Sequence, residues 1–142
     1  MAVYNFSVKN DGNKKVTEHF RVSEFACHDG SDNVPIDIDL AFKLEDIRQH
    51  FGKAITIPSG YRSPSYNKKI GGTSDSYHVK GRAFDIVANG VSPYEVAHYA
   101  QGLWINGIGC YYDDGFVHID SRKQPTFWKN QTITPVPTFE NL

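Results

Sequence analysis

The chain has 142 residues, of which 39% are hydrophobic, 13% aromatic and 22% charged, a balance typical of one folded domain rather than of a disordered tail. The formal net charge of -1 provides no attraction for nucleic acid or anionic lipid. No apolar run approaches the roughly 18 residues that a membrane span needs. The N-terminus lacks a basic stretch followed by an apolar core, so we expect no signal peptide.

The amino-terminal third begins with turn-rich sequence and ends with the first clear helix. Residues 1–34 carry loop signals, and residues 16–25 alternate loosely enough for a short strand or a docking arm. A helix is predicted over residues 38–51, capped by Asp37 and ended by Gly52. Its apolar face is formed at helical spacing by Leu40, Leu44, Ile47 and Phe51.

Shorter elements are predicted in the middle of the chain. Residues 54–58 are rich in β-branched side chains and indicate a strand. A serine followed by proline starts a brief helix over residues 63–69. Residues 71–76 are a loop, and residues 83–87 are a further strand.

A second helix and a hairpin follow. Ser92, Pro93 and Glu95 supply a capping serine, a proline in the first turn and a capping-box glutamate. Two strands are then predicted at 107–112 and 116–120, joined by an Asp-Asp-Gly turn whose residues tolerate positive φ.

This element order predicts the α+β class, with helices packed on a small antiparallel sheet. We expect a monomer and a single domain over residues 1–142, with its motifs between about 16 and 122. Residues 123–142 contain three prolines and are predicted to be irregular and surface-lying. Cys27 and Cys110 show no metal-binding spacing and are interpreted as buried, inert thiols, with a disulfide between them left open.

Two histidines and an aspartate could form an open zinc site. His78 and Asp85 are seven residues apart with Gly81 between them, a spacing that lets a loop ligand and a strand ligand converge. His118 would arrive from the last predicted strand, where alternation places it on the same face as Asp120. Three protein ligands leave the fourth position of a catalytic zinc free, which makes the chain a candidate hydrolase.

The residue pattern alone leaves other interpretations open. Asp85 lies between two apolar residues and is costly to bury without a cation, which could be zinc but also Arg62 or Arg82 in a metal-free domain. The remaining histidines have no partner pattern and are interpreted as surface or lightly packed residues: His19, His28, His50 and His98.

The sequence resembles a known family. The pattern Ser-x-His-x-x-Gly-x-Ala-x-Asp over residues 76–85, followed by Phe-Val-His-Ile-Asp over 116–120, closely resembles the zinc-dependent D-alanyl-D-alanine carboxypeptidases. That family includes phage L-alanyl-D-glutamate endolysins and murein endopeptidases, and its fold is shared with the hedgehog signalling domain. Further similarity lies at residues 22–30, 57–67 and 107–109, so the resemblance covers most of the chain.

The resemblance implies a zinc enzyme with His78, Asp85 and His118 as metal ligands. Arg62 matches an arginine beside the substrate, where its guanidinium fork can hold a carboxylate or the developing oxyanion. Ser76 matches a motif serine that either bonds to substrate or a ligand or is a simple loop residue. A metal-activated water would attack the peptide, so no serine or cysteine nucleophile is needed.

The general base is not fixed by the resemblance. Many relatives carry a carboxylate three residues before the last ligand or a histidine two residues before it, whereas this chain has Gly115 and Phe116 there. Asp120 shares a strand face with that ligand and is the leading candidate, unless it only orients the ligand. Asp114 and Asp113 are alternatives if the hairpin tip leans over the metal; otherwise they only form the turn.

We therefore expect a zinc-dependent peptidase that acts on peptidoglycan stem peptides, of the D-Ala-D-Ala carboxypeptidase or the L,D- or D,D-endopeptidase type. It would be a phage-encoded lysis enzyme or a bacterial enzyme that acts in the periplasm or the extracellular wall. The alternative is a non-catalytic zinc-containing module that binds the cell wall or a protein partner, which the missing upstream base favours.

Overall fold

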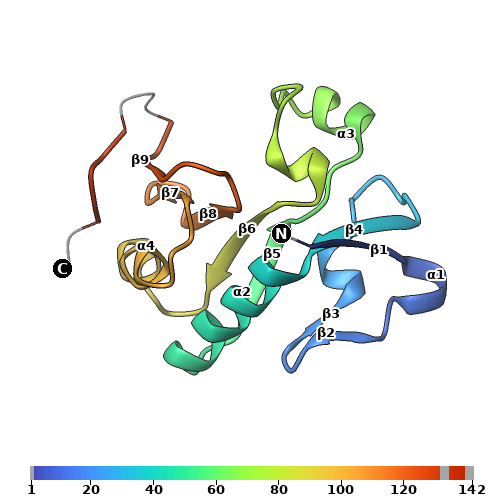
Figure 1. Ribbon diagram of the computed structural model, residues 1–142, viewed down its shortest axis with the longest axis horizontal. Helices are drawn as coiled ribbons and strands as arrows, with labels where there is room; N and C mark the ends of the chain where they lie inside the picture. The colour runs from blue at the N-terminus through green and yellow to red at the C-terminus, as the bar shows by residue number, and fades with distance from the viewer. Residues whose placement is uncertain (1, 132–134, 140–142) are drawn as a thin grey trace.

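A computed structural model describes residues 2–131 and 135–139 of the chain. At its centre is a five-stranded sheet with the order β5-β6-β8-β7-β9, in which β7 and β9 are parallel and the other neighbours are antiparallel (Figure 1). The α+β prediction is thereby confirmed. The strands are β5 (Ile55–Ser59), β6 (Ala83–Ala88), β7 (Gly107–Tyr111), β8 (Phe116–Asp120) and β9 (Thr126–Lys129).

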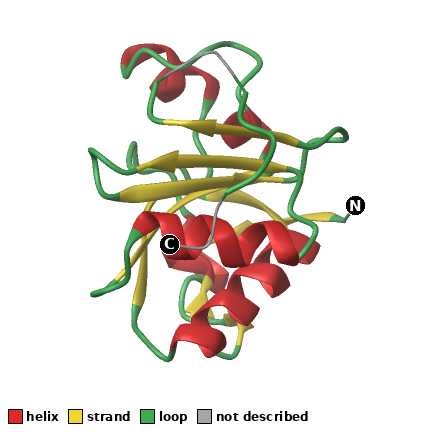
Figure 2. Ribbon diagram, turned by 90° about the vertical axis from the view of Figure 1, so that its left-hand side faces the viewer, coloured by secondary structure: helices red, strands yellow, loops and turns green. Residues whose placement is uncertain are grey.

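Two helices, α2 (Ile38–Phe51) and α4 (Pro93–Gly102), pack beside each other below the strands in Figure 2. The side chain of Asp37 accepts a hydrogen bond at the start of α2, and Gly52 ends that helix in the left-handed conformation with φ 61°. The capping box predicted from Ser92 is present at the start of α4. The bounds predicted for the first helix and the start predicted for the second are confirmed, because capping residues in the local sequence set these positions.

The amino-terminal region adds two small sheets that the sequence did not predict as such. β1 (Val3–Ser7) pairs antiparallel with β4 (Asn33–Asp37), and β2 (Lys15–Thr17) pairs with β3 (Phe20–Arg21). The sequence of β1 shows no clear alternation of polar and apolar residues, and its partner β4 lies about 30 residues away along the chain, so no local pattern predicts this pair. Two short helices, α1 (Val8–Asp11) and the 3-10 helix η1 (Val22–Phe25), complete this region.

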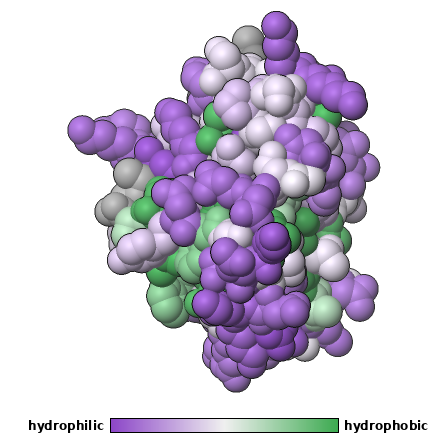
Figure 3. All heavy atoms as spheres, turned by 90° about the vertical axis from the view of Figure 1, so that its right-hand side faces the viewer, coloured by the Kyte–Doolittle hydropathy of each residue, from purple (hydrophilic) through white to green (hydrophobic). Residues whose placement is uncertain are grey.

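One face of the central sheet packs on the hydrophobic core, and the other face carries polar side chains. Val117 and Ile119 of β8 are buried with residues of α2 and α4, while His118 and Asp120 alternate onto the opposite face. On that side the chain between β5 and β6 forms α3 (Pro64–Lys69), a loop and the 3-10 helix η2 (Tyr77–Lys80). Figure 3, which views the molecule from the right-hand side of Figure 1, shows a mostly hydrophilic surface with hydrophobic side chains gathered across its middle.

The carboxyl-terminal segment differs from its prediction. The expectation of an irregular tail is wrong for Thr126–Lys129, which form β9 and extend the sheet beside β7. Pro125 lies just before this strand, a position that does not interrupt its ladder. Phe139 is also buried, at 1% exposure, and the amide of Gln101 donates a hydrogen bond to its carbonyl oxygen. In the described part of this segment, the residues at Thr126–Lys129 and at Phe139 are therefore held by partners elsewhere in the fold.

Both cysteines are buried free thiols, as expected. Burial raises the pKa of Cys110 to about 11, so this thiol stays protonated at neutral pH and is a poor nucleophile. Among the described residues, the structure has no helix with both the length and the apolar character required to cross a bilayer.

Candidate metal centre

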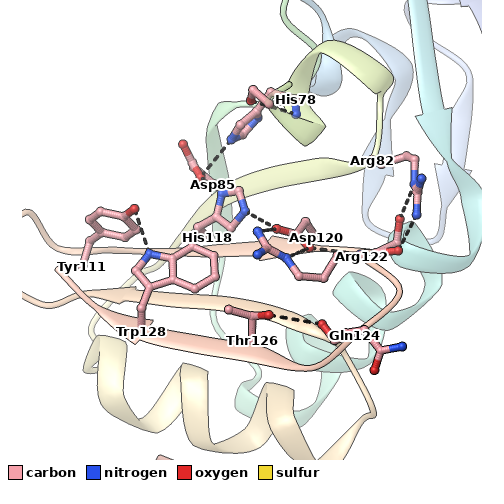
Figure 4. A network of polar contacts seen from close by, with 12 residues as sticks. His78, Arg82, Asp85, Tyr111, His118, Asp120, Arg122, Gln124, Thr126 and Trp128 are labelled. Atoms are coloured by element: carbon pink, nitrogen blue, oxygen red, sulfur yellow. Dashed lines mark hydrogen bonds and ion pairs between the residues drawn. The ribbon is translucent and has the colours of Figure 1, made fainter. Parts of the chain in front are cut away.

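Three predicted ligands meet on the face of the sheet opposite α4. Asp85 of β6 and His118 of β8 are direct cross-strand partners, and His118 Nδ1 lies 3.0 Å from Asp85 Oδ1. His78 comes from η2, and its Nε2 lies 3.3 Å from the same oxygen. The ligand atoms of these residues all lie within 4.8 Å of one another, and Figure 4 shows their side chains pointing toward one another. Two strands and a short helix thus bring the three side chains to one point.

Local geometry aims His78 at this point. The hydroxyl of Ser76 accepts a hydrogen bond from the backbone N–H of His78 and caps η2, which gives this serine a structural role. Gly81 ends η2 at φ 72°, and a Cβ there would lie 2.5 Å from the Pro35 carbonyl oxygen. His78 Nδ1 lies 2.8 Å from the carbonyl oxygen of Gly60. A proton on Nδ1 is donated to that carbonyl, which leaves the Nε2 lone pair for a cation.

The electrostatics of the cluster also favour a cation. Burial alone raises the pKa of Asp85, but hydrogen bonds from His118 and His78 outweigh it and hold this pKa well below its usual range. Burial alone lowers the pKa of His118, whereas Asp120 and Asp85 together raise it to about 9. Without a metal the cluster is therefore an ionised carboxylate beside a protonated imidazole. An aspartate with two imidazoles is a donor set that zinc uses in catalytic sites, so these residues fit the ion.

Arg62 lies at the edge of the cluster. Its Nη2 is 3.5 Å from Asp85 Oδ2, its Nε donates to Ser59 Oγ at 2.9 Å, and its Nη1 donates to Asn67 Oδ1 at 3.3 Å. Three acceptors therefore fix the direction of the guanidinium. Arg82, the other arginine considered for Asp85, instead donates to the hydroxyl and the carbonyl oxygen of Ser121.

Asp120 lies on the far side of the His118 ring from Asp85. Its Oδ2 is 2.7 Å from His118 Nε2, and the guanidinium of Arg122 donates to both carboxylate oxygens at 2.8 and 2.6 Å. Asp120 is fully buried. Because both oxygens are engaged and the imidazole separates them from the ligand cluster, this geometry favours the interpretation of Asp120 as a residue that orients the ligand.

The other two base candidates lie outside the cluster. Asp113 and Asp114 are exposed in the turn between β7 and β8, and neither lines the cavity beside His118. The backbone N–H of Asp113 donates to Asn130 Oδ1 at 3.1 Å, and Gly115 takes φ 80°. This geometry favours the turn-forming role that the sequence left open for them.

A cavity of about 670 Å³ opens over the cluster. Asp75, in the loop before η2, is the lining carboxylate besides Asp85 and Asp120 among the described residues. Sequence reasoning missed several residues of its wall, which are aromatic or cationic: Tyr77, Tyr111, Arg122 and Trp128. The signal that could have located Trp128 is Gly109, since a small residue on a strand face leaves space for a larger neighbour.

A second group of metal-ligand residue types, formed by Glu18, His19 and Glu45, is held together by hydrogen bonds to Glu45. Glu45 of α2 accepts hydrogen bonds from Thr17, from the backbone of His19 and from Gln49, and His19 Nδ1 lies 2.6 Å from it. Nearby Glu18 is exposed. This group holds the β2–β3 hairpin against α2. The remaining histidines also have partners: His28 contacts the Pro58 carbonyl, His50 stacks on Tyr99, and His98 contacts the Phe139 carbonyl.

Comparison with known proteins finds a family model that covers the cluster and several relatives of this chain. The family model described as Peptidase M15 matches residues 16–120. A probable peptidoglycan L,D-endopeptidase MepK of Haemophilus influenzae is 33% identical over 102 residues, which are 66% of this chain and 54% of that protein. The peptidoglycan L,D-endopeptidase MepK of Escherichia coli is 34% identical over 74 residues, which are 49% of this chain and 41% of that protein. The chain thus spans about half the length of the curated relatives it matches.

Proposed function

The chain belongs to the peptidase M15 family, and from this premise we propose that it is a zinc-dependent peptidase that hydrolyses peptidoglycan stem peptides. The observation that carries the proposal is the meeting of His78, Asp85 and His118 in the wall of a cavity that Arg62 also lines. The relatives are named as L,D-endopeptidases, which favours cleavage within the stem over removal of a terminal D-alanine. The site of action would be the cell wall.

In this proposal His78 Nε2, an Asp85 oxygen and His118 Nδ1 hold the zinc. When bound, zinc supplies Lewis-acid chemistry that lowers the pKa of a water to about 7 and polarises a carbonyl. Arg62 binds a substrate carboxylate or the developing oxyanion, since its planar fork is already fixed by three acceptors.

The proton acceptor is assigned by elimination among the described carboxylates of the cavity. Asp85 is a ligand, and Asp120 is engaged by Arg122 and His118. Asp75 is the carboxylate that remains among them. We therefore assign the general base to Asp75, and Asp114 is the competing residue if the hairpin tip moves over the cavity.

The direct test is hydrolysis of purified peptidoglycan by zinc-loaded protein, measured as new free amino groups. We expect release that is lost on chelation and in His78→Ala, and one zinc per chain that is lost in Asp85→Ala. Asp75→Asn should lower kcat at least about 100-fold while zinc content stays at one, and Asp114→Asn should match wild type. A large loss in Asp114→Asn alone would move the base to the hairpin tip.

The competing function is a non-catalytic zinc-containing module that binds cell wall. It is favoured by one observation, which is that Gly115 and Phe116 cannot act as bases. Fully zinc-loaded protein that sediments with peptidoglycan but releases no amines from walls of several chemistries would support that function and exclude the peptidase.

A further inference from the structure

Two side chains beyond β8 complete the surroundings of His118. Arg122 follows β8 by two residues, and Trp128 lies in β9. Both lie outside residues 16–120, the part of the chain that matches the family. Neither supplies a ligand atom to the cluster, yet both line its cavity.

Arg122 holds the Asp120 carboxylate, and this carboxylate in turn orients the His118 imidazole. Its Nε donates to Asp120 Oδ1 at 2.8 Å and its Nη2 donates to Oδ2 at 2.6 Å, a bidentate pair. Its backbone N–H donates to the same Oδ1 at 3.0 Å. Asp120 therefore presents Oδ2 to His118 Nε2 at 2.7 Å in one orientation. A bond on Nε2 sets the ring so that Nδ1 faces Asp85.

Trp128 packs against both the His118 ring and the Arg122 guanidinium. Its ring centroid lies 5.3 Å from that of His118, and the guanidinium carbon of Arg122 lies 4.9 Å above the indole. The same guanidinium lies 5.2 Å from the centroid of the Tyr77 ring, so it lies over two aromatic rings. The indole N–H donates to the Tyr111 hydroxyl at 2.9 Å, which fixes the ring. Figure 4 shows Trp128 and Arg122 beside His118, with Asp85 beyond it.

We propose that Arg122 and Trp128 are positioning residues that hold the His118 imidazole with Nδ1 toward the metal. The carboxyl-terminal segment after residue 120 thereby completes the metal centre. The proposal rests on the metal site of the proposed function and is independent of the substrate.

Zinc affinity tests this proposal, measured by competition with a chelating dye. Arg122→Gln and Trp128→Ala should each bind zinc about 10- to 100-fold more weakly, the usual effect of removing an outer partner of a ligand. Lys80→Gln is the matched control, because Lys80 also places a cation over Tyr77, at 4.6 Å, without touching Asp120. It should bind zinc as wild type does. The visible spectrum of the cobalt-substituted variants should shift as well, which a loss of stability alone would not cause.

Tryptophan emission gives a second readout, since the chain has two tryptophans and Trp104 is 84% exposed. In Trp104→Phe, cobalt should quench most of the remaining emission at one equivalent. In Trp128→Phe, the emission of Trp104 should change little. Equal quenching of both would show that Trp128 does not lie beside the metal.

Circular dichroism of the metal-free variants establishes that they fold. If Arg122→Gln or Trp128→Ala does not fold, Arg122→Lys and Trp128→Phe replace them, and a threefold or larger loss of affinity is expected. Folded variants with wild-type zinc affinity and cobalt spectrum would overturn the proposal, whatever the hydrolytic activity. Normal zinc binding by the wild-type protein without hydrolysis would instead reject the peptidase function and leave this proposal intact.

Discussion

Two glycines of β7 make room for the side chains that support His118. A Cβ on Gly107 would lie 1.8 Å from Asp120 Oδ1, and a Cβ on Gly109 would lie 2.5 Å from Trp128 Cε2. Both glycines are buried, and so is Asp120, which leaves a displaced carboxylate little free space, whereas a displaced Trp128 indole would shift toward the cavity that it lines. The space beside the metal ligand therefore depends on the absence of two side chains.

We predict that Gly109→Ala displaces Trp128 and weakens zinc binding about tenfold, and that Gly107→Ala destabilises the fold by about 2 kcal/mol. Gly102→Ala is the control, because a Cβ there meets nothing within 4 Å and Gly102 is the last residue of α4. That control should be neutral or slightly stabilising. Dye competition and urea unfolding measure the two effects, and a Gly109→Ala protein with unchanged affinity would contradict this account.

At the same scale, sequence could identify the side chains of the cluster but not all of their partners. His78, Asp85 and His118 follow from a motif and from strand alternation, both of which are local. The roles of Asp120 and Arg122 follow from which nitrogen of His118 faces which carboxylate. That orientation is set by packing across three strands, and no spacing in the sequence encodes it.

Among the elements, α3 links Arg62 to the loop that follows the helix, because its residue Asn67 bonds to both. Asn67 is 2% exposed, and its amide accepts from Arg62 at 3.3 Å and donates to the Thr73 carbonyl at 2.7 Å. Gly72 lies so close that a Cβ there would be 2.0 Å from Asn67 Oδ1. One side chain thus holds both the arginine and the loop.

We predict that Asn67→Ala lowers kcat/KM for stem-peptide hydrolysis at least about tenfold, because Arg62 loses an acceptor and the loop loses its donor. Zinc content should stay at one per chain, since Asn67 contacts none of the three ligands. Asn67→Asp keeps the acceptor and removes the donor, so it separates the two contributions. Wild-type kinetics in Asn67→Ala would show that neither bond matters for catalysis.

The contact between the β2–β3 hairpin and α2 gives a pH dependence of stability. Burial alone raises the pKa of Glu45, but the hydrogen bonds from His19, Thr17 and Gln49 outweigh it and lower the pKa from 4.5 to about 2. Because the folded-state pKa is the lower one, the stabilisation is complete above the unfolded pKa and is lost as the pH falls through the folded pKa.

We predict that the free energy of unfolding falls by on the order of 2 kcal/mol between pH 5 and pH 2 through this group. Glu45→Gln should be less stable than wild type at pH 7 and should show a smaller change over that window. Urea unfolding at several pH values measures both effects, and parallel curves for the two proteins would rule out Glu45 as the source.

At the scale of the whole molecule, the carboxyl-terminal segment packs on the body of the fold as well as beside the metal site. Phe139 is 1% exposed, its ring lies 5.6 Å from that of Phe127, and its backbone N–H donates to Gln101 Oε1 at 2.8 Å. Residues near the end of the chain are thereby fixed to α4 and β9. Helices with strong caps could be predicted from sequence, whereas this segment could not, since its order comes from partners distant in the chain.

Phe139→Ala is predicted to lower the free energy of unfolding by about 3 kcal/mol through loss of buried area. It should leave zinc affinity within about twofold of wild type, because Phe139 does not line the cavity. Urea unfolding and dye competition give the two values. A joint loss of stability and affinity would mean that β9 and Phe139 act as one unit.

Asp85 and His118 are paired residues on adjacent central strands, and each strand has neighbours on both sides. Their separation is therefore set by the backbone ladder before any ion arrives. Small zinc domains acquire their fold from the metal, but this scaffold is preorganised and should be cooperatively folded in its apo form. Amide hydrogen exchange in β6 and β8 should accordingly be slow with or without zinc. The ion would then bind to ligand atoms whose positions the fold has already set.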